Sequence, residues 1–208
     1  MRPTAPWWPL ATGLGPAELD DRVDDPISGT LGFWTADGRL MRTDGVSTTV
    51  IATLQTLGFQ RIPHMYLLDG GLIELLSTDW RREVILHPDG AVFARASAPA
   101  HRFNGFGDQT ASPGGSMVAY ALTSVFGGAR VYVLRQGDRH GELVYRTRQG
   151  VAECDLPLAW NGRWLLFTPH GADPVAIDMD GGSGPIELPD LSQWLPWGTG
   201  TVSWMVPG

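Results

Sequence analysis

Histidine and carboxylate side chains give this chain its best means of doing chemistry. Five of them fall at similar places in a repeated pattern of short strands: His64, His101, Asp108, Glu153 and Asp155. A histidine beside a carboxylate can act as an oriented general base, and two carboxylates about 5 to 10 Å apart can hydrolyse a glycosidic bond. The alternative is that these side chains hydrate a channel or cap the ends of strands. The sequence therefore predicts one candidate site, provided that its strands bring these residues together.

No contiguous catalytic signature accompanies these residues. Gly-x-Ser-x-Gly, His-Glu-x-x-His, Cys-x-x-Cys and Gly-x-Gly-x-x-Gly are all absent from the sequence. A site assembled from one or two residues of each repeat would leave no such signature, so the absence does not decide between an enzyme and a binding protein.

Two tryptophans offer a second kind of binding site. Trp194 and Trp197 flank Pro196 in a stretch that is typical of a loop. Exposed rings in such a loop could stack on a sugar or an aromatic ligand. The alternative is that they fill the core between sheets, which is the role expected of most of the nine tryptophans.

The sequence favours no metal and no cofactor. Asp178 and Asp180 alternate in a way that could bind Ca²⁺, but the glycines that follow them are typical of a hairpin turn. The five histidines show no ligand spacing, and His87 and His140 fall at hairpin turns where we expect exposed side chains. The single Cys154 lies in a strand-like run, which favours a buried thiol.

The basic residues exclude several functions. All fifteen are arginine, which rules out a Schiff-base lysine and a Walker phosphate loop. The codon preference of a GC-rich bacterial genome explains this bias most simply. A net charge of −7 without a cluster of arginines argues against nucleic acid or an anionic membrane as partner. The remaining partners are a small-molecule ligand or another protein.

Tight turns repeat about every forty residues, each followed by a short apolar run, and this period is typical of the blades of a β-propeller. The abundance of glycine and proline also favours an all-β fold with many turns. The five turns lie at 28–30, 69–71, 112–115, 161–162 and 198–200. The strands predicted in the first four units lie at 31–35, 39–42 and 48–54; at 59–67, 72–77, 82–86 and 91–97; at 117–122, 130–135 and 142–147; and at 164–168, 174–179 and 185–188.

These units predict a small closed propeller of five blades, each a four-stranded antiparallel sheet. The fifth unit has a strand at 202–206 but lacks its outer half, which the runs at 7–10 and 17–23 could supply. We therefore expect residues 1–208 to form one domain whose last blade is completed by the N-terminal segment. A four-bladed ring or a fragment of a larger propeller is the alternative. No convincing signal peptide and no apolar run long enough to span a bilayer is present, so the expected location is the cytoplasm.

The repeat resembles that of TolB-type propellers, a WD40-like family. The similarity lies in Ser-Pro-Gly-Gly-Ser-Met-Val-Ala-Tyr at 112–120, Arg-Val-Tyr-Val-Leu at 130–134 and Trp-Asn-Gly-Arg-Trp-Leu-Leu-Phe at 160–167. It covers residues 107–190 best, although the turn at 112–115 lacks the usual aspartate. The resemblance implies the architecture, while proteins that carry this repeat range from periplasmic scaffolds to regulatory propellers of peptidases.

Two functions remain open. The first is a binding module that presents an axial pocket or a loop face to a ligand or a protein. The second is a small hydrolase, lyase or cyclase with a histidine and a carboxylate at the propeller axis. Because only inner strands converge on the axis, we expect any site near His64, His101, Asp108, Glu153 and Asp155. The glycines of Asp37-Gly38, Asp89-Gly90 and Asp180-Gly181 are expected to have positive φ.

Overall fold

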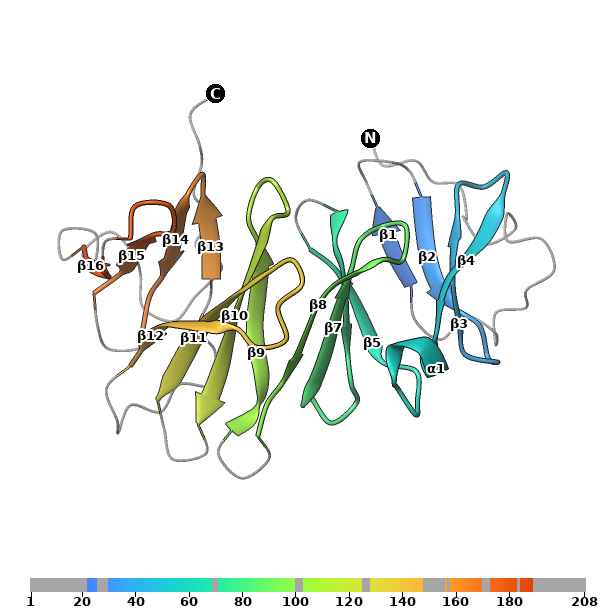
Figure 1. The fold of residues 1–208 in the computed structure, drawn as a ribbon, viewed down its shortest axis with the longest axis horizontal. Coiled ribbons are helices and arrows are strands. Elements are labelled where there is room, and N and C mark those ends of the chain that lie inside the picture. The colour runs from blue at the N-terminus through green and yellow to red at the C-terminus, as the bar shows by residue number, and fades with distance from the viewer. Residues whose placement is uncertain are drawn as a thin grey trace, which may run out of the picture.

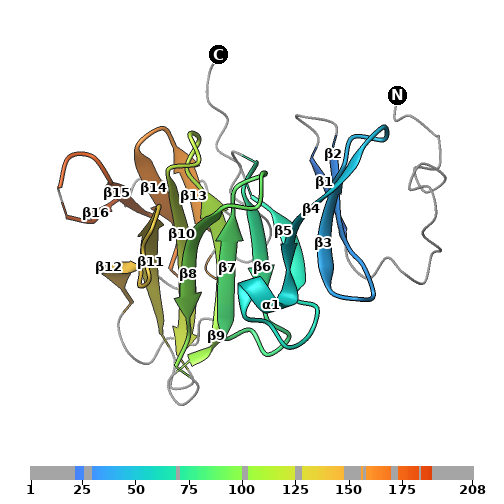
Figure 2. The same cartoon turned by 45° about the vertical axis from the view of Figure 1, so that its right-hand side comes forward.

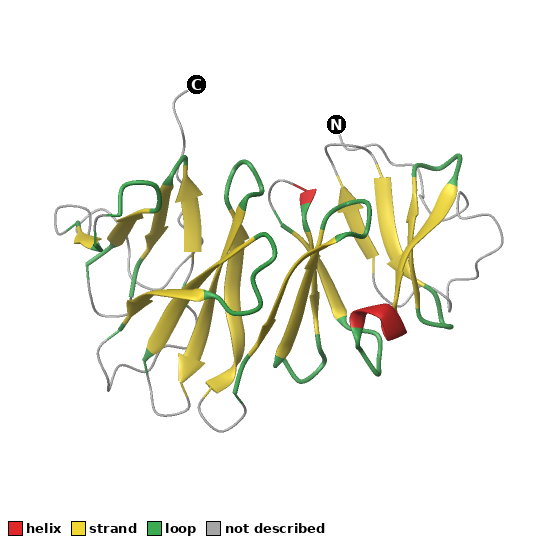
Figure 3. Cartoon of the chain, viewed as in Figure 1, coloured by secondary structure: helices red, strands yellow, loops and turns green. Residues whose placement is uncertain are grey.

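The computed structural model describes residues 22–25, 30–68, 71–99, 103–124, 128–147, 156, 158–169, 173–182 and 184–188. This part contains sixteen strands and one short α-helix (Figures 1 and 3). The strands are β1 (Arg22–Asp25), β2 (Thr30–Trp34), β3 (Arg39–Thr43), β4 (Thr48–Thr53), β5 (His64–Leu67), β6 (Ile73–Leu76), β7 (Arg82–Leu86), β8 (Val92–Ser97), β9 (Phe103–Ala111), β10 (Met117–Ser124), β11 (Ala129–Arg135), β12 (Glu142–Arg146), β13 (Leu158–Asn161), β14 (Trp164–Phe167), β15 (Val175–Asp178) and β16 (Ile186–Glu187); the helix is α1 (Leu54–Leu57).

The strands form four separate antiparallel sheets, each of four strands joined in chain order. We call them blade 1 (β1–β4), blade 2 (β5–β8), blade 3 (β9–β12) and blade 4 (β13–β16). They follow one another along the molecule, with their faces turned toward each other (Figures 1 and 2). The all-β propeller fold is thereby confirmed, and the predicted strands of these units agree with the structure to within two residues at each end, except for 59–67.

The connection between blades 1 and 2 differs from the prediction. Residues 59–63 are not a strand, and the chain forms helix α1 just before them. The Thr53 hydroxyl caps this helix by accepting a hydrogen bond from the Thr56 amide at 3.2 Å, and Gly58 ends it with φ of 80°. The capping residues therefore add a helical turn directly after β4, and the inner strand of blade 2 begins only at His64.

Strand β1 also corrects the prediction for the N-terminal segment. Val23, which was assigned with residues 17–23 to the fifth blade, pairs with Gly32 of β2. Strand β1 is therefore the inner strand of blade 1. The strand expected at 202–206 and the run at 7–10 lie outside the described residues.

Each pair of neighbouring blades buries an apolar core between its sheets. Trp34 of blade 1 packs with Leu75 of blade 2. Phe93 of blade 2 packs with Leu134 of blade 3, and Val131 of blade 3 packs with Leu165 of blade 4. Successive residues of a strand point to opposite faces, so each inner blade contributes alternate residues to two cores.

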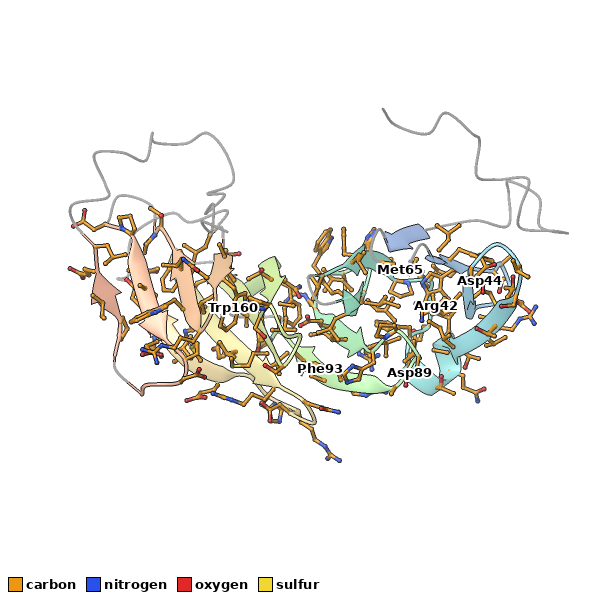
Figure 4. All side chains as sticks on the ribbon, turned by 90° about the horizontal axis from the view of Figure 1, so that it is seen from above. Arg42, Asp44, Met65, Asp89, Phe93 and Trp160 are labelled. Carbon is orange, nitrogen blue, oxygen red and sulfur yellow. The ribbon has the colours of Figure 1, made fainter. Side chains whose placement is uncertain are left out.

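The turn before the outer strand of one blade reaches back to the preceding blade. The Gly137 amide in blade 3 donates to the Phe93 carbonyl on β8 at 2.7 Å. The Arg42 guanidinium of blade 1 donates to the Pro88 carbonyl in blade 2 at 3.2 Å. Seen from above, Met65 of an inner strand and Phe93 of an outer strand lie at opposite edges of the ribbon, so these turns join the blades near the outer edge (Figure 4).

His87 departs from the expectation of an exposed side chain. Its ring is half-buried and meets Phe93 edge to face at 5.5 Å, and its Nε2 is buried without a hydrogen-bond partner among the described residues. The β7–β8 turn lies against blade 1 rather than in open solvent, which explains the difference. His140 is exposed, as expected.

The turn glycines follow the prediction at two of three positions. Gly38 has φ of 80° and Gly90 has φ of 89°. The prediction is wrong at Gly181, because the positive φ of that turn, 62°, belongs to Gly182. Gly181 is required for space instead, since a Cβ there would overlap the Asp178 carboxylate.

Replacing Gly90 by alanine should cost clearly more stability than replacing Gly137 by alanine. Both glycines have similar positive φ, 89° and 86°, so both variants incur a backbone cost of about 1 kcal/mol. A Cβ at Gly90 would also collide with the Ile51 carbonyl oxygen, whereas one at Gly137 has nothing within 4 Å. Urea unfolding of the two variants measures the difference, and equal losses would show that the two blades are not in contact at Gly90.

Candidate functional site

The structure describes the side chain of one of the seven predicted site residues. His64 begins β5, the inner strand of blade 2. The backbone of Asp108 lies on β9, the inner strand of blade 3, as expected. His101, Glu153, Asp155, Trp194 and Trp197 lie outside the described residues. The inner strands do approach one another, since β1 lies beside β5 and β9 beside β13.

His64 stacks on Trp80, a contact that the sequence did not predict. The two rings lie 5.3 Å apart between centroids, at an angle of 26°. Trp80 is 41% exposed and has φ of 58°, which makes it the one non-glycine residue with positive φ in the described part of the chain. A bulky residue in this conformation is strained, and such strain often accompanies function.

Hydrogen bonds on both sides hold Trp80 in this conformation. Its amide donates to the Ser77 carbonyl at 2.8 Å, and its carbonyl accepts from the Phe106 amide of blade 3 at 3.0 Å. The Asp79 carboxylate accepts from the Ser77 hydroxyl at 2.5 Å, and this bond is the main reason that the pKa of Asp79 is lowered. The turn is therefore fixed to the neighbouring blade while the indole ring remains at the surface.

Tyr66 extends this ring pair along β5. It lies two residues after His64 on the same face of the strand and is 41% exposed. We call His64, Tyr66 and Trp80 the aromatic surface. Aromatic side chains with a polar atom are frequent at the centres of protein interfaces, so the arrangement suits binding.

Two buried carboxyl groups lie on the same face of blade 2. Glu74 on β6 pairs with Tyr66, and Glu83 on β7 pairs with Leu76. Leu76 belongs to the core between blades 2 and 3, so both acids face blade 3 as diagonal neighbours. Burial raises the pKa of Glu74 to about 8, and burial together with the nearby Glu74 raises the pKa of Glu83 well above its usual range.

Blade 3 presents Gln109 and Tyr120 to this pair. The two residues stand opposite each other on β9 and β10. The Gln109 amide lies beside Glu74 and lowers the pKa of Glu74, against the larger effect of burial. The side-chain nitrogen and oxygen of Gln109 nevertheless form no hydrogen bond of ordinary geometry in the described part. Burial, and then the nearby Glu83, raises the pKa of Tyr120. We call Glu74, Glu83, Gln109 and Tyr120 the polar seam.

The sequence analysis did not identify the polar seam, although a signal for it exists. Glu74 is the single charged residue of the apolar strand Ile-Glu-Leu-Leu at 73–76, and Glu83 precedes the apolar run Val-Ile-Leu at 84–86 in a strand that begins with Arg82. A lone acid at an inward position of such a strand indicates a buried polar group that needs a partner.

The acidic turn at 178–180 has a structural role. The Asp178 carboxylate accepts hydrogen bonds from the amides of Asp180 and Gly181, at 3.1 and 3.0 Å, and forms an ion pair with Arg163 at 3.0 Å. Within the described ranges, no three His, Cys, Asp or Glu side chains gather to hold a metal ion. No helix in that part is long and apolar enough to cross a bilayer.

Comparison with known proteins yields similarity in structure alone. No protein-family model and no curated protein sequence matches the chain. The WD40 domain of SCAP from fission yeast aligns with 82% of this chain and 44% of its own, at 12% identity and a TM-score of 0.49. Sqt1 from Saccharomyces cerevisiae aligns with 85% of this chain and 50% of its own, at 10% identity and a TM-score of 0.48. BamB from Moraxella catarrhalis aligns with 79% of this chain and 51% of its own, at 14% identity and a TM-score of 0.44. This chain thus spans about half the length of each, and likeness at this level says nothing about what it binds.

Proposed function

We propose that this chain is a TolB-type or WD40-like propeller that acts as a binding module and contacts a protein partner through the aromatic surface. The observation that carries this proposal is the Trp80 ring, held at positive φ against His64 and 41% exposed. An interface residue that is rigid before binding loses little entropy on binding, which favours affinity. A small-molecule ligand at the same rings is the alternative occupant.

A catalytic role is supported less well. Its best argument is that Glu74, with a pKa of about 8, lies diagonally across from His64 on the neighbouring strand. A general acid must reach the reacting group, however, and Glu74 is 4% exposed. The predicted contributions of His101, Asp108, Glu153 and Asp155 to an axial site remain predictions.

Replacing Trp80 by glycine should weaken partner binding while the fold is retained. Glycine adopts the φ of 58° without strain, so the turn and its bond to Phe106 persist while the ring is removed. Loss of a central interface tryptophan costs about 2 kcal/mol or more, which weakens Kd by roughly thirtyfold. The partner is captured from a lysate of the source cells, produced separately and titrated against each variant.

Leu143→Ala is the matched control, because Leu143 is 42% exposed but lies on β12 of blade 3. The proposal requires wild-type Kd for this variant and weakened binding for Trp80→Gly, with both variants retaining the wild-type thermal transition. Equal Kd values for wild type and Trp80→Gly would remove the aromatic surface from the interface.

A further inference from the structure

The polar seam contains a carboxyl group with no hydrogen-bond partner among the described residues. Glu83 is 1% exposed, and neither of its oxygens forms a hydrogen bond within the described part of the chain. Its diagonal neighbour Glu74 is 4% exposed. Two negative charges in these positions would face each other inside an apolar core, at a large cost in free energy.

We propose that the polar seam makes the contact between blades 2 and 3 a pH-sensitive joint. The two blades are in contact while Glu74 and Glu83 are neutral, and they separate when these acids ionise. Burial, without a compensating cation among the described side chains, keeps both groups protonated in the closed joint. Ionisation is favourable only where water reaches them, and that requires the two blade faces to separate. The raised pKa of Glu74, about 8, places this change near neutral to mildly alkaline pH.

The described groups around the pair do not compensate its charge. His64 and Tyr66 share its face on β5, and Tyr120 faces it from β10. On β11, Tyr132 and Arg130 lie on the same face as Leu134, which packs in the core between blades 2 and 3. Arg130 lies near the start of this strand, where it pairs with Leu122 of β10. Among the described residues, no basic group contributes to the pKa of either acid, whose shifts arise from burial, from their mutual repulsion and from the Gln109 amide. On β8, Arg95 is directed to the other face, where it donates to the Leu57 carbonyl at 2.8 Å.

The joint also supports the aromatic surface. The hydrogen bond from the Phe106 amide to the Trp80 carbonyl crosses the same seam and fixes the turn that carries the indole. Loosening of the seam would release this bond. The consequence for binding rests on the proposed function, whereas the joint itself does not.

The test compares amide hydrogen exchange of Phe106, measured by NMR between pH 6 and pH 8, with that of Leu134, which lies within β11 and is paired with Val118 of β10. Using Leu134 as the internal reference cancels the intrinsic effect of pH on exchange. The pKa of each buried acid is higher while the joint is closed than after it opens, so each acid releases its proton when the joint opens. Opening of the joint therefore becomes more favourable as pH rises toward about 8, the pKa of Glu74 in the closed joint. Each acid that ionises on opening contributes a factor of up to about ten for each pH unit, so the protection of Phe106 relative to Leu134 should fall by up to about tenfold if one acid ionises and up to about a hundredfold if both do.

The double variant Glu74→Gln/Glu83→Gln keeps the shape of both side chains and cannot ionise, so its relative protection should not change with pH. Glu187→Gln, at an exposed position of β16, should behave as wild type. A wild-type ratio that is constant with pH, or a double variant that loses protection as wild type does, would overturn the joint. Loss of binding by Trp80→Gly would be unaffected by that result, so the two proposals fail separately.

Discussion

A chain that lacks residues 1–20 should lose its cooperative thermal transition or aggregate. Phe33 is fully buried although it lies on the face of blade 1 that is turned away from blade 2, in the same row as Met41 and Val50. Leu166 is likewise buried on the face of blade 4 that is turned away from blade 3. Both outer faces of a row of sheets need cover, and a fifth blade shared between the chain ends would provide it.

Phe33→Ala in the full-length chain tests the same expectation without a truncation. A buried phenylalanine replaced by alanine costs about 3–5 kcal/mol, so urea unfolding should show a loss of that size. A truncated chain that keeps the full transition, together with a small loss for Phe33→Ala, would contradict the five-bladed ring.

Replacing Glu83 by leucine should stabilise the protein by about 1–4 kcal/mol at pH 8. The change removes a buried acid that has no hydrogen-bond partner in the described part and places an apolar side chain opposite Leu76 and Ala96. Below about pH 4 the gain should be smaller, because the acid is then neutral in the unfolded chain as well. The measurement is the free energy of unfolding in urea at both pH values.

Glu187→Leu, at an exposed site, is the control and should not produce this gain. If Glu83→Leu is less stable than wild type at pH 8, Glu83 has a stabilising partner, and the buried acids of the polar seam do not lower the free energy of unfolding.

The repeat of turns made most of the fold predictable. The glycines of Asp37-Gly38 and Asp89-Gly90 have the positive φ that tight hairpin turns require, and the strands on either side of them lie within two residues of the predicted positions. The local prediction was wrong between blades 1 and 2. The run Thr-Thr-Val-Ile-Ala-Thr at 48–53 forms β4 as predicted, but the Thr53–Thr56 cap and Gly58 add a helical turn after it, and residues 59–63 do not form the predicted strand.

The site was less predictable because it depends on how blades face each other. His64 was chosen as an inner-strand residue, yet its partner Trp80 comes from a turn whose positive φ no sequence rule assigns to tryptophan. Glu74 and Glu83 lie nine residues apart in the chain, and the strand register is needed to place them on one face opposite Gln109.

The most direct test of the proposed function is a photo-crosslink from the aromatic surface. A photoreactive phenylalanine derivative is placed at Tyr66 in one chain and at Leu143 in another, positions of similar exposure on blades 2 and 3. Irradiation in the source cells should crosslink the partner from position 66 and not from position 143, and adding Trp80→Gly should remove the product. Crosslinking of the partner from position 143 alone, or a product at position 66 that persists in Trp80→Gly, would contradict binding through His64, Tyr66 and Trp80.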